Sequence, residues 1–100
     1  MSDALDKINA NVTARDFLII NKKGLHARAT AKFVQCCEKY EADITVSKDG
    51  EIVGGSSIMG ILTLGAGIGS TIRVSASGPH ATDALNALEA LIANRFGEEE

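Results

Sequence analysis

Residues 42–54 have the sequence ADITVSKDGEIVG, in which two short runs of alternating apolar and polar residues flank Asp49 and Gly50. An Asp-Gly pair between two such runs is typical of a two-residue β-hairpin turn. Alternation with a period of two places every second side chain on the same face, so each run is expected to form a strand with one buried face. The central part of the chain therefore indicates an antiparallel sheet.

Two further strands are expected, one on each side of this hairpin. The run ARDFLII at residues 14–20 is rich in strand-forming residues and is followed by the turn-like sequence NKKG. The run TIRVSAS at residues 71–77 has apolar residues at every second position. The complete sheet is therefore predicted to contain four strands.

Three helices are expected between and after these strands. Residues 27–39 have small or apolar side chains at helical spacing, namely Ala27, Thr30, Ala31, Phe33, Val34 and Cys37. Ser57 is suited to cap a short helix over residues 57–64, although Gly60 weakens that prediction. An apolar stripe predicts the last helix over residues 79–94. The order βαββαβα predicts an α+β open-faced sandwich, with three helices covering one face of a four-stranded antiparallel sheet.

Length and composition limit the classes of function. A chain of 100 residues with 45% hydrophobic and 23% charged residues is expected to be one ordered domain. We divide it into a polar leader at 1–13, a domain at 14–97 and an acidic tail at 98–100. The net charge of −3 argues against general nucleic-acid binding, and no apolar run is long enough to span a bilayer. The adjacent Cys36 and Cys37 are unsuited to a structural disulfide, which favours a cytoplasmic location.

The charges are distributed unevenly along the chain. Residues 17–37 contain four basic residues and no acidic one, the basic residues being Lys22, Lys23, Arg28 and Lys32. Three glutamates close the chain at 98–100. One surface of this acidic protein is therefore expected to be cationic.

The segment GLHARATA at residues 24–31 carries the main chemical signal, because His26 lies between a loop and the expected start of a helix. The unpaired N–H groups of a first helical turn favour a phosphate, and Arg28 adds a permanent positive charge. A neutral imidazole is also a nitrogen nucleophile near neutral pH. The alternative is that His26 is an ordinary surface or capping residue.

Three segments, in the same order, resemble the histidine-containing phosphocarrier family, HPr. They are GLHARATA at 24–31, SSIMGILTLG at 56–65 and SASGPHATDALNALEALI at 75–92. The resemblance covers about residues 14–95 and leaves the leader unmatched. It departs from the family pattern at Ala29, where proline is common. Proline suits a first helical turn but is not required there, so the departure concerns rigidity rather than chemistry.

The resemblance implies a phosphocarrier of the phosphoenolpyruvate-dependent phosphotransferase system. His26 would accept a phosphoryl group from enzyme I and pass it to an enzyme IIA, as a transfer intermediate rather than an independent enzyme. Arg28 would orient and neutralise the phosphoryl group, and the amides near Ala27 and Arg28 would help to hold it. The resemblance implies no metal or organic cofactor. We expect no nucleic-acid or membrane partner. We also expect a monomer, because a carrier must expose its site to two successive partners. Sugar uptake and a nitrogen-type regulatory relay both remain open.

The resemblance also implies a regulatory role for Ser57, on which a serine kinase and phosphatase would act, and a docking role for Ile58 and Met59. A phosphate on Ser57 would add negative charge beside the docking surface and repel partners. The alternatives are that Ser57 is a plain helix cap and that Ile58 or Met59 packs in the core.

Other motifs are better explained by structure than by chemistry. GAGIGS at residues 65–70 follows a helix and precedes a strand, so it is a helix stop and not a dinucleotide-binding loop. Cys36 and Cys37 lack the spacing of a metal site, and we expect Cys37 in the core and Cys36 partly exposed. His80 is expected to be a solvated residue at a helix end. Two other functional classes are alternatives: a regulatory binding module in which His26 is incidental, and a small-molecule enzyme, for which no second catalytic group is evident.

Overall fold

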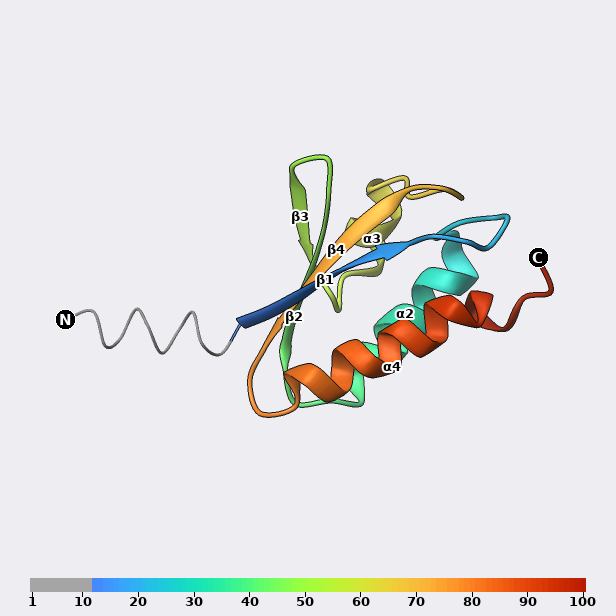
Figure 1. The fold of residues 1–100 in the computed structure, drawn as a ribbon. Helices are drawn as coiled ribbons and strands as arrows, with labels where there is room; N and C mark the ends of the chain where they lie inside the picture. Colours follow the sequence, from blue (N-terminus) through green and yellow to red (C-terminus); the bar gives the residue numbers. More distant parts are fainter. Residues whose placement is uncertain (1–11) are drawn as a thin grey trace.

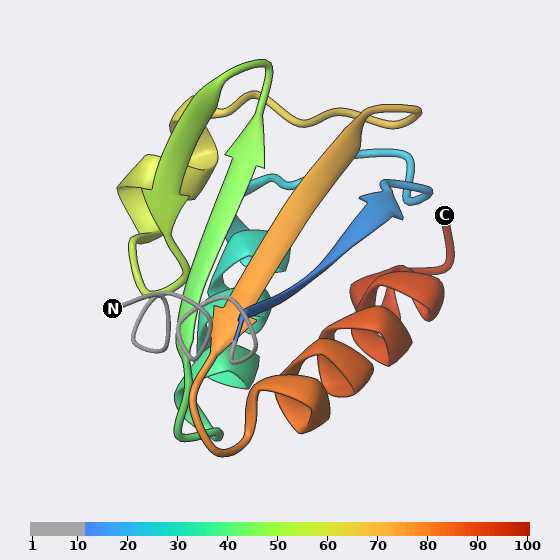
Figure 2. The same ribbon diagram turned by 60° about the vertical axis from the view of Figure 1, so that its left-hand side comes forward.

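The computed structural model describes residues 12–100, and within them a four-stranded antiparallel sheet has the order β1-β4-β2-β3. The strands are β1 (Val12–Leu18), β2 (Asp43–Lys48), β3 (Glu51–Gly54) and β4 (Thr71–Ser77). Strand β1 pairs with β4 along its whole length, from Val12 opposite Ser77 to Leu18 opposite Thr71. The two strands most distant in sequence thus lie side by side (Figure 2).

Three helices and one short turn of 3₁₀ helix complete the described part of the chain. They are α2 (Ala27–Glu38), α3 (Ile58–Thr63), α4 (Ala81–Ala93) and η1 (Arg95–Gly97). Figures 1 and 2 show α2 and α4 on the same side of the sheet, and no helix of residues 12–100 lies on the opposite face. The predicted open-faced sandwich and its βαββαβα order are therefore confirmed. None of the described helices is long and apolar enough to cross a membrane.

The hairpin turn has the predicted geometry, because Asp49 and Gly50 both adopt positive φ angles, 52° and 87°. The first strand was predicted too late, at residues 14–20. It begins at Val12, where pairing with Ser77 starts, and it ends at Leu18. Most of the predicted polar leader, residues 1–11, lies outside the described residues.

The core lies between the sheet and the helices, and it is mainly aliphatic. Its largest fully buried apolar side chains are Phe33, Phe96, Ile19, Ile61, Ile72, Leu85, Leu88, Val46 and Val74. On α2 the prediction of the buried face was wrong at the first turn, since Ala29 is buried and Ala27 is exposed. Ala27 faces solvent beside His26, whereas Ala29 turns toward the core. Helix α2 therefore packs against the core through the face that carries Ala29, Thr30, Phe33, Val34 and Cys37.

Close packing explains why a glycine, Gly60, lies within α3. A Cβ atom at Gly60 would lie 2.7 Å from Ser57 Oγ and 3.0 Å from Val53 Cβ. Ser57 Oγ accepts a hydrogen bond of 3.0 Å from the Gly60 N–H, which is the predicted helix cap. Glycine therefore lets the cap and the strand approach the helix closely, and its low helix propensity does not prevent the helix.

The two cysteines have the predicted environments, with Cys37 buried and Cys36 partly exposed. Burial, with smaller contributions from the neighbouring Cys36 and Glu38, raises the pKa of the Cys37 thiol to about 12. Burial also raises the pKa of Cys36, against an opposing effect of Lys39.

Because the thiolate is the reactive form, we expect iodoacetamide at pH 8 to modify the native protein slowly and only at Cys36. Denaturant should release the second thiol at Cys37. Peptide mass spectrometry after timed alkylation measures both sites. Equal alkylation rates at the two cysteines of the native protein would contradict the burial of Cys37.

Candidate functional site at the start of helix α2

His26 is the N-cap residue of α2, with extended backbone angles (φ −76°, ψ −177°) and no side-chain capping hydrogen bond. Its carbonyl accepts the first helical hydrogen bond from the Thr30 N–H at 2.8 Å. The N–H groups of Ala27, Arg28 and Ala29 precede this bond and have no backbone partner within residues 12–100. The imidazole thus stands beside three unpaired donors at the positive end of a 12-residue helix.

The connection from β1 to α2 is held by a backbone and a side-chain hydrogen bond that fix the place of His26. The Leu25 N–H donates to the Ala66 carbonyl at 2.8 Å, and the buried Asn21 Nδ2 donates to the Gly24 carbonyl at 2.8 Å. Gly24 has a φ of +66°, and a Cβ atom there would lie 2.5 Å from the Ala66 oxygen. Only glycine satisfies both the backbone conformation and this close approach.

After α4 the chain makes a left-handed turn that brings its end back to His26. Arg95, Phe96 and Gly97 have consecutive positive φ angles of 53°, 55° and 79°. Such angles disfavour residues other than glycine by roughly 1–2 kcal/mol each. Phe96 is almost fully buried, and its carbonyl accepts a hydrogen bond of 2.5 Å from Lys32 Nζ. These contacts offset the cost of the turn, which we call the C-terminal hook (Arg95–Glu100).

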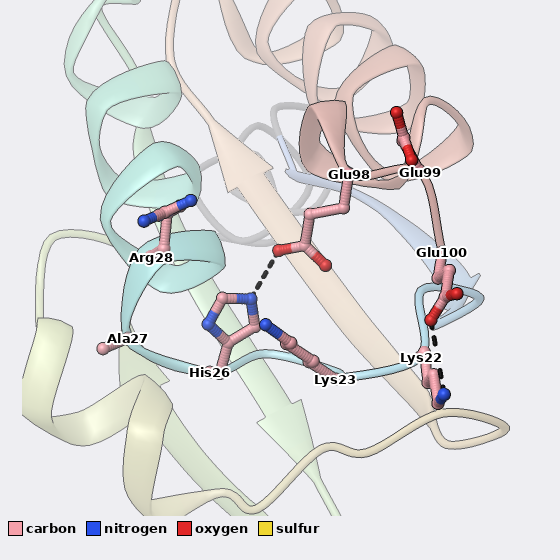
Figure 3. A pocket seen from close by; sticks show the side chains of 8 residues that line it. All are labelled: Lys22, Lys23, His26, Ala27, Arg28, Glu98, Glu99 and Glu100. Atoms are coloured by element: carbon pink, nitrogen blue, oxygen red, sulfur yellow. Dashed lines mark hydrogen bonds and ion pairs between the residues drawn. The ribbon is translucent and has the colours of Figure 1, made fainter.

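The hook places the carboxylate of Glu98 directly on the imidazole. Glu98 Oε2 contacts His26 Nε2, and Glu98 Oε1 accepts a hydrogen bond of 3.1 Å from Asn21 Nδ2 (Figure 3). An ionised carboxylate is only an acceptor, so the ring nitrogen that faces it carries the proton. The lone pair of a neutral imidazole is then on Nδ1, which has no hydrogen-bond partner among the described residues. In Figure 3 this nitrogen points toward the side on which α2 begins.

The contact with His26 lowers the pKa of the Glu98 carboxyl, and hydrogen bonding from Asn21 and the charge of Lys23 act in the same direction. Glu98 is therefore ionised at neutral pH. Because its pKa is lowered on folding, the contact adds stability above the ordinary carboxyl pKa. That contribution is lost as the pH falls through the lowered pKa.

The imidazole forms part of the wall of an open hollow of about 570 Å³. Its lining comes from the β1–α2 connection, the first turn of α2 and the hook: Lys22, Lys23, His26, Ala27, Arg28, Glu98, Glu99 and Glu100 (Figure 3).

Arg28 is exposed and has no ion pair within residues 12–100. The predicted cationic surface is therefore partly covered by the acidic tail. Lys22 binds Glu100 through its backbone N–H at 2.5 Å and through its side chain at 3.3 Å.

The predicted docking residues lie elsewhere, on α3. Ile58 and Met59 at the start of this helix are 43% and 70% exposed, and Ser57 is their half-buried N-cap. The alternative reading, in which one of the two packs in the core, is not what the structure shows. None of these three residues lines the hollow at His26. His80 is exposed at the N-cap of α4 without a capping bond, as expected.

Comparison with known proteins places this geometry in a family. A model described as the phosphorylation site of the HPr component of the phosphotransferase system matches residues 13–94. The chain belongs to the HPr family. It is 51% identical to the phosphocarrier protein HPr of Cupriavidus necator over 86 residues, which cover 86% of this chain and 97% of that protein. It is 46% identical to the HPr of Pseudomonas aeruginosa over 87% and 98% of the two chains.

Solved HPr structures share the fold. The crystal structure of an HPr from Thermoanaerobacter tengcongensis superposes with a TM-score of 0.84 at 43% identity, over 88% of this chain and 99% of that chain. The HPr of Bacillus anthracis gives a TM-score of 0.78 at 41% identity, over 81% and 96%. A second structure from T. tengcongensis, with a TM-score of 0.70 at 45% identity, is described as an HPr dimer.

Within this HPr fold, Asn21 and Glu98 are site residues that no sequence pattern predicts. Asn21 was assigned to a turn and Glu98 to a tail, and 72 residues separate Glu98 from His26. Phe96 and Gly97 were the available signals, because an aromatic residue followed by glycine after a helix suggests an anchored turn. Among residues 12–100, no three His, Cys, Asp or Glu side chains are grouped so that they could bind a metal ion.

We expect Gly24→Ala to destabilise the fold by roughly 2–4 kcal/mol, because it combines a positive φ angle with a backbone clash. Gly67→Ala is the matched control, since its Cβ atom would meet nothing within 4 Å and its φ angle is not positive. Urea unfolding measures both variants. Similar midpoints for the two would contradict the proposed role of the Gly24 contact.

Proposed function

We propose that this protein carries a phosphoryl group on Nδ1 of His26 within the phosphotransferase system. Its donor is the phosphohistidine of enzyme I, and its acceptor is an enzyme IIA. The Nδ1 lone pair forms a bond to phosphorus while the bond from phosphorus to the donor nitrogen breaks, and that nitrogen keeps the electron pair. The Nε2 proton stays in place, so the transfer needs no separate base.

One observation carries this proposal: among residues 12–100, a ring nitrogen without a hydrogen-bond partner stands next to three N–H groups without a backbone partner at a helix start. These donors and the helix dipole stabilise the negative phosphoryl oxygens without any conformational change. The imidazole is 28% exposed at the rim of an open hollow. A second protein can therefore approach it, as direct transfer between proteins requires.

Arg28 is proposed to neutralise and orient the phosphoryl group. It lies two residues after His26 on the first turn of α2, and it has no competing ion pair within residues 12–100. A planar guanidinium can donate two parallel hydrogen bonds to phosphate oxygens. The amides of Ala27 and Arg28 would hold the same oxygens from the helix side.

The partners are proposed to dock on α3 as well as at His26. The exposed Ile58 and Met59 offer an apolar contact of the kind that anchors protein interfaces. A carrier that serves two partners in turn must leave this surface free, which supports a monomer. The free thiols of Cys36 and Cys37 fit a reducing compartment, which supports a cytoplasmic site of action.

Ser57 is proposed to be a regulatory phosphorylation site for a serine kinase and phosphatase. Its hydroxyl oxygen caps α3, directly before Ile58 and Met59. A phosphate there would add about −1.5 to −2 charges at the edge of this docking surface. This charge would repel acidic groups of enzyme I, and it would hold water beside the apolar surface of Ile58 and Met59. Both effects would weaken the binding of enzyme I.

We expect the purified protein, incubated with phosphoenolpyruvate and enzyme I, to gain one acid-labile phosphate that is absent from His26→Ala. Arg28→Ala should slow the gain about a hundredfold, because it removes a charged donor from the transferring group. Arg73→Ala on the face of the sheet opposite the helices is the matched control and should transfer normally. Intact-mass spectrometry follows all four proteins. A phosphate on His26→Ala would overturn the assignment of His26.

Ser57→Asp should keep the fold but reduce the rate of phosphorylation by enzyme I, while Ser57→Ala should only lose about 1 kcal/mol of stability with its cap. Thermal unfolding and the initial rate of phosphate transfer separate the two effects. If Ser57→Asp transferred at the rate of the unchanged protein, regulation by charge at this position would be wrong.

A further inference from the structure

The C-terminal hook presents a single carboxylate to the imidazole, and several independent contacts hold it there. Asn21 Nδ2 binds Glu98 Oε1, while Glu98 Oε2 contacts His26 Nε2. The buried Phe96 and the bond from Lys32 anchor the hook before Glu98. The backbone bond from Lys22 to Glu100 anchors it afterwards. The side chain of Glu98 is 18% exposed, so most of its surface is covered by neighbouring residues.

We propose that Glu98 is the positioning residue of His26, which holds the proton on Nε2 and stabilises the positive charge that the ring acquires on phosphorylation. This proposal rests on the proposed function of His26. It assigns a role to the segment after Asn94, where the match to the family model ends.

The charge balance of the transfer explains why a carboxylate is needed. When the Nδ1 lone pair forms a bond to phosphorus, Nε2 keeps its hydrogen and the ring becomes positively charged. A carboxylate on Nε2 interacts more favourably with this charged ring than with the neutral ring. It therefore stabilises the phosphorylated product, and the transition state before it, relative to the unphosphorylated protein. The carboxylate thus acts like the aspartate that orients the histidine of a serine-protease triad.

The same geometry argues against a tail that simply blocks the site. Glu98 occupies Nε2, on the side of the ring away from the start of α2, and leaves Nδ1 without a partner among the described residues (Figure 3). The Asn21 bond keeps the second carboxylate oxygen occupied. The hook therefore orients the ring and leaves the attacking nitrogen open.

The first test observes the imidazole in the unphosphorylated full-length protein. In ¹⁵N-labelled protein at neutral pH, we expect one exchange-protected imidazole N–H signal from His26, and we expect it on Nε2. Glu98→Ala should abolish its protection, whereas Glu98→Gln should retain an N–H signal because its amide oxygen still accepts. Protection that survives in Glu98→Ala, or a proton on Nδ1 in the unchanged protein, would overturn the proposal.

The second test measures single-turnover transfer from phosphorylated enzyme I. Glu98→Ala should lower the rate at saturating enzyme I about tenfold, as removal of a group that orients a functional histidine typically does. Glu98→Gln should also be slower, because it retains the acceptor but not the charge. Glu99→Ala is the matched control: it removes an equal charge from the same tail without touching His26. Equal effects of Glu98→Ala and Glu99→Ala would show a general charge effect and overturn the positioning role.

The two tests separate this proposal from the function on which it rests. If the unchanged protein accepts no phosphate from enzyme I, the proposed function fails. The imidazole signal still reports whether Glu98 holds the Nε2 proton in that case. If phosphate is accepted normally by both the unchanged protein and Glu98→Ala, the function stands and the role of Glu98 is wrong.

Discussion

The geometry of the site depends on the close approach of Gly24 to the loop at Ala66 and Gly67. A Cβ atom at Gly24 would lie 2.5 Å from the Ala66 oxygen and 2.6 Å from the Gly67 Cα atom. The next residue, Leu25, donates its N–H to the same Ala66 carbonyl and is itself buried. The residue that follows, His26, is therefore held at the start of α2 with its side chain at the surface. Without this close approach, the loop that carries His26 would have no fixed position beside the three unpaired N–H groups at the start of α2.

A second constraint comes from the far end of the chain. The left-handed turn at Arg95–Gly97 is unfavourable by itself, and burial of Phe96 between the helices and the sheet holds it in place. The turn then leads Glu98 to His26 and Asn21. Each side of the imidazole thus has a separate environment. Nε2 faces an anion, and Nδ1 lies on the side of the cationic helix start.

Local patterns predicted the fold well, because each element carries its own signal. Alternation defined β2, β3 and β4, and the Asp49-Gly50 pair defined the hairpin. The strand β1 was placed two residues too late because Val12 and Thr13 follow a polar segment, and only their pairing with β4 shows that they belong to the sheet. At the candidate site, His26 and Arg28 follow from the sequence of a helix start. Glu98 does not, because its contact depends on the packing of Phe96 and not on any local pattern.

The central claim is that the two ring nitrogens of His26 have different roles, with Nδ1 open for attack and Nε2 held by Glu98. The most direct test is the ³¹P–¹⁵N coupling in ¹⁵N-histidine-labelled protein that enzyme I has phosphorylated. The geometry predicts that phosphorus is bonded to Nδ1, with the proton remaining on Nε2. Phosphorus bonded to Nε2 would require the contact with Glu98 to be broken before transfer, and it would contradict the account.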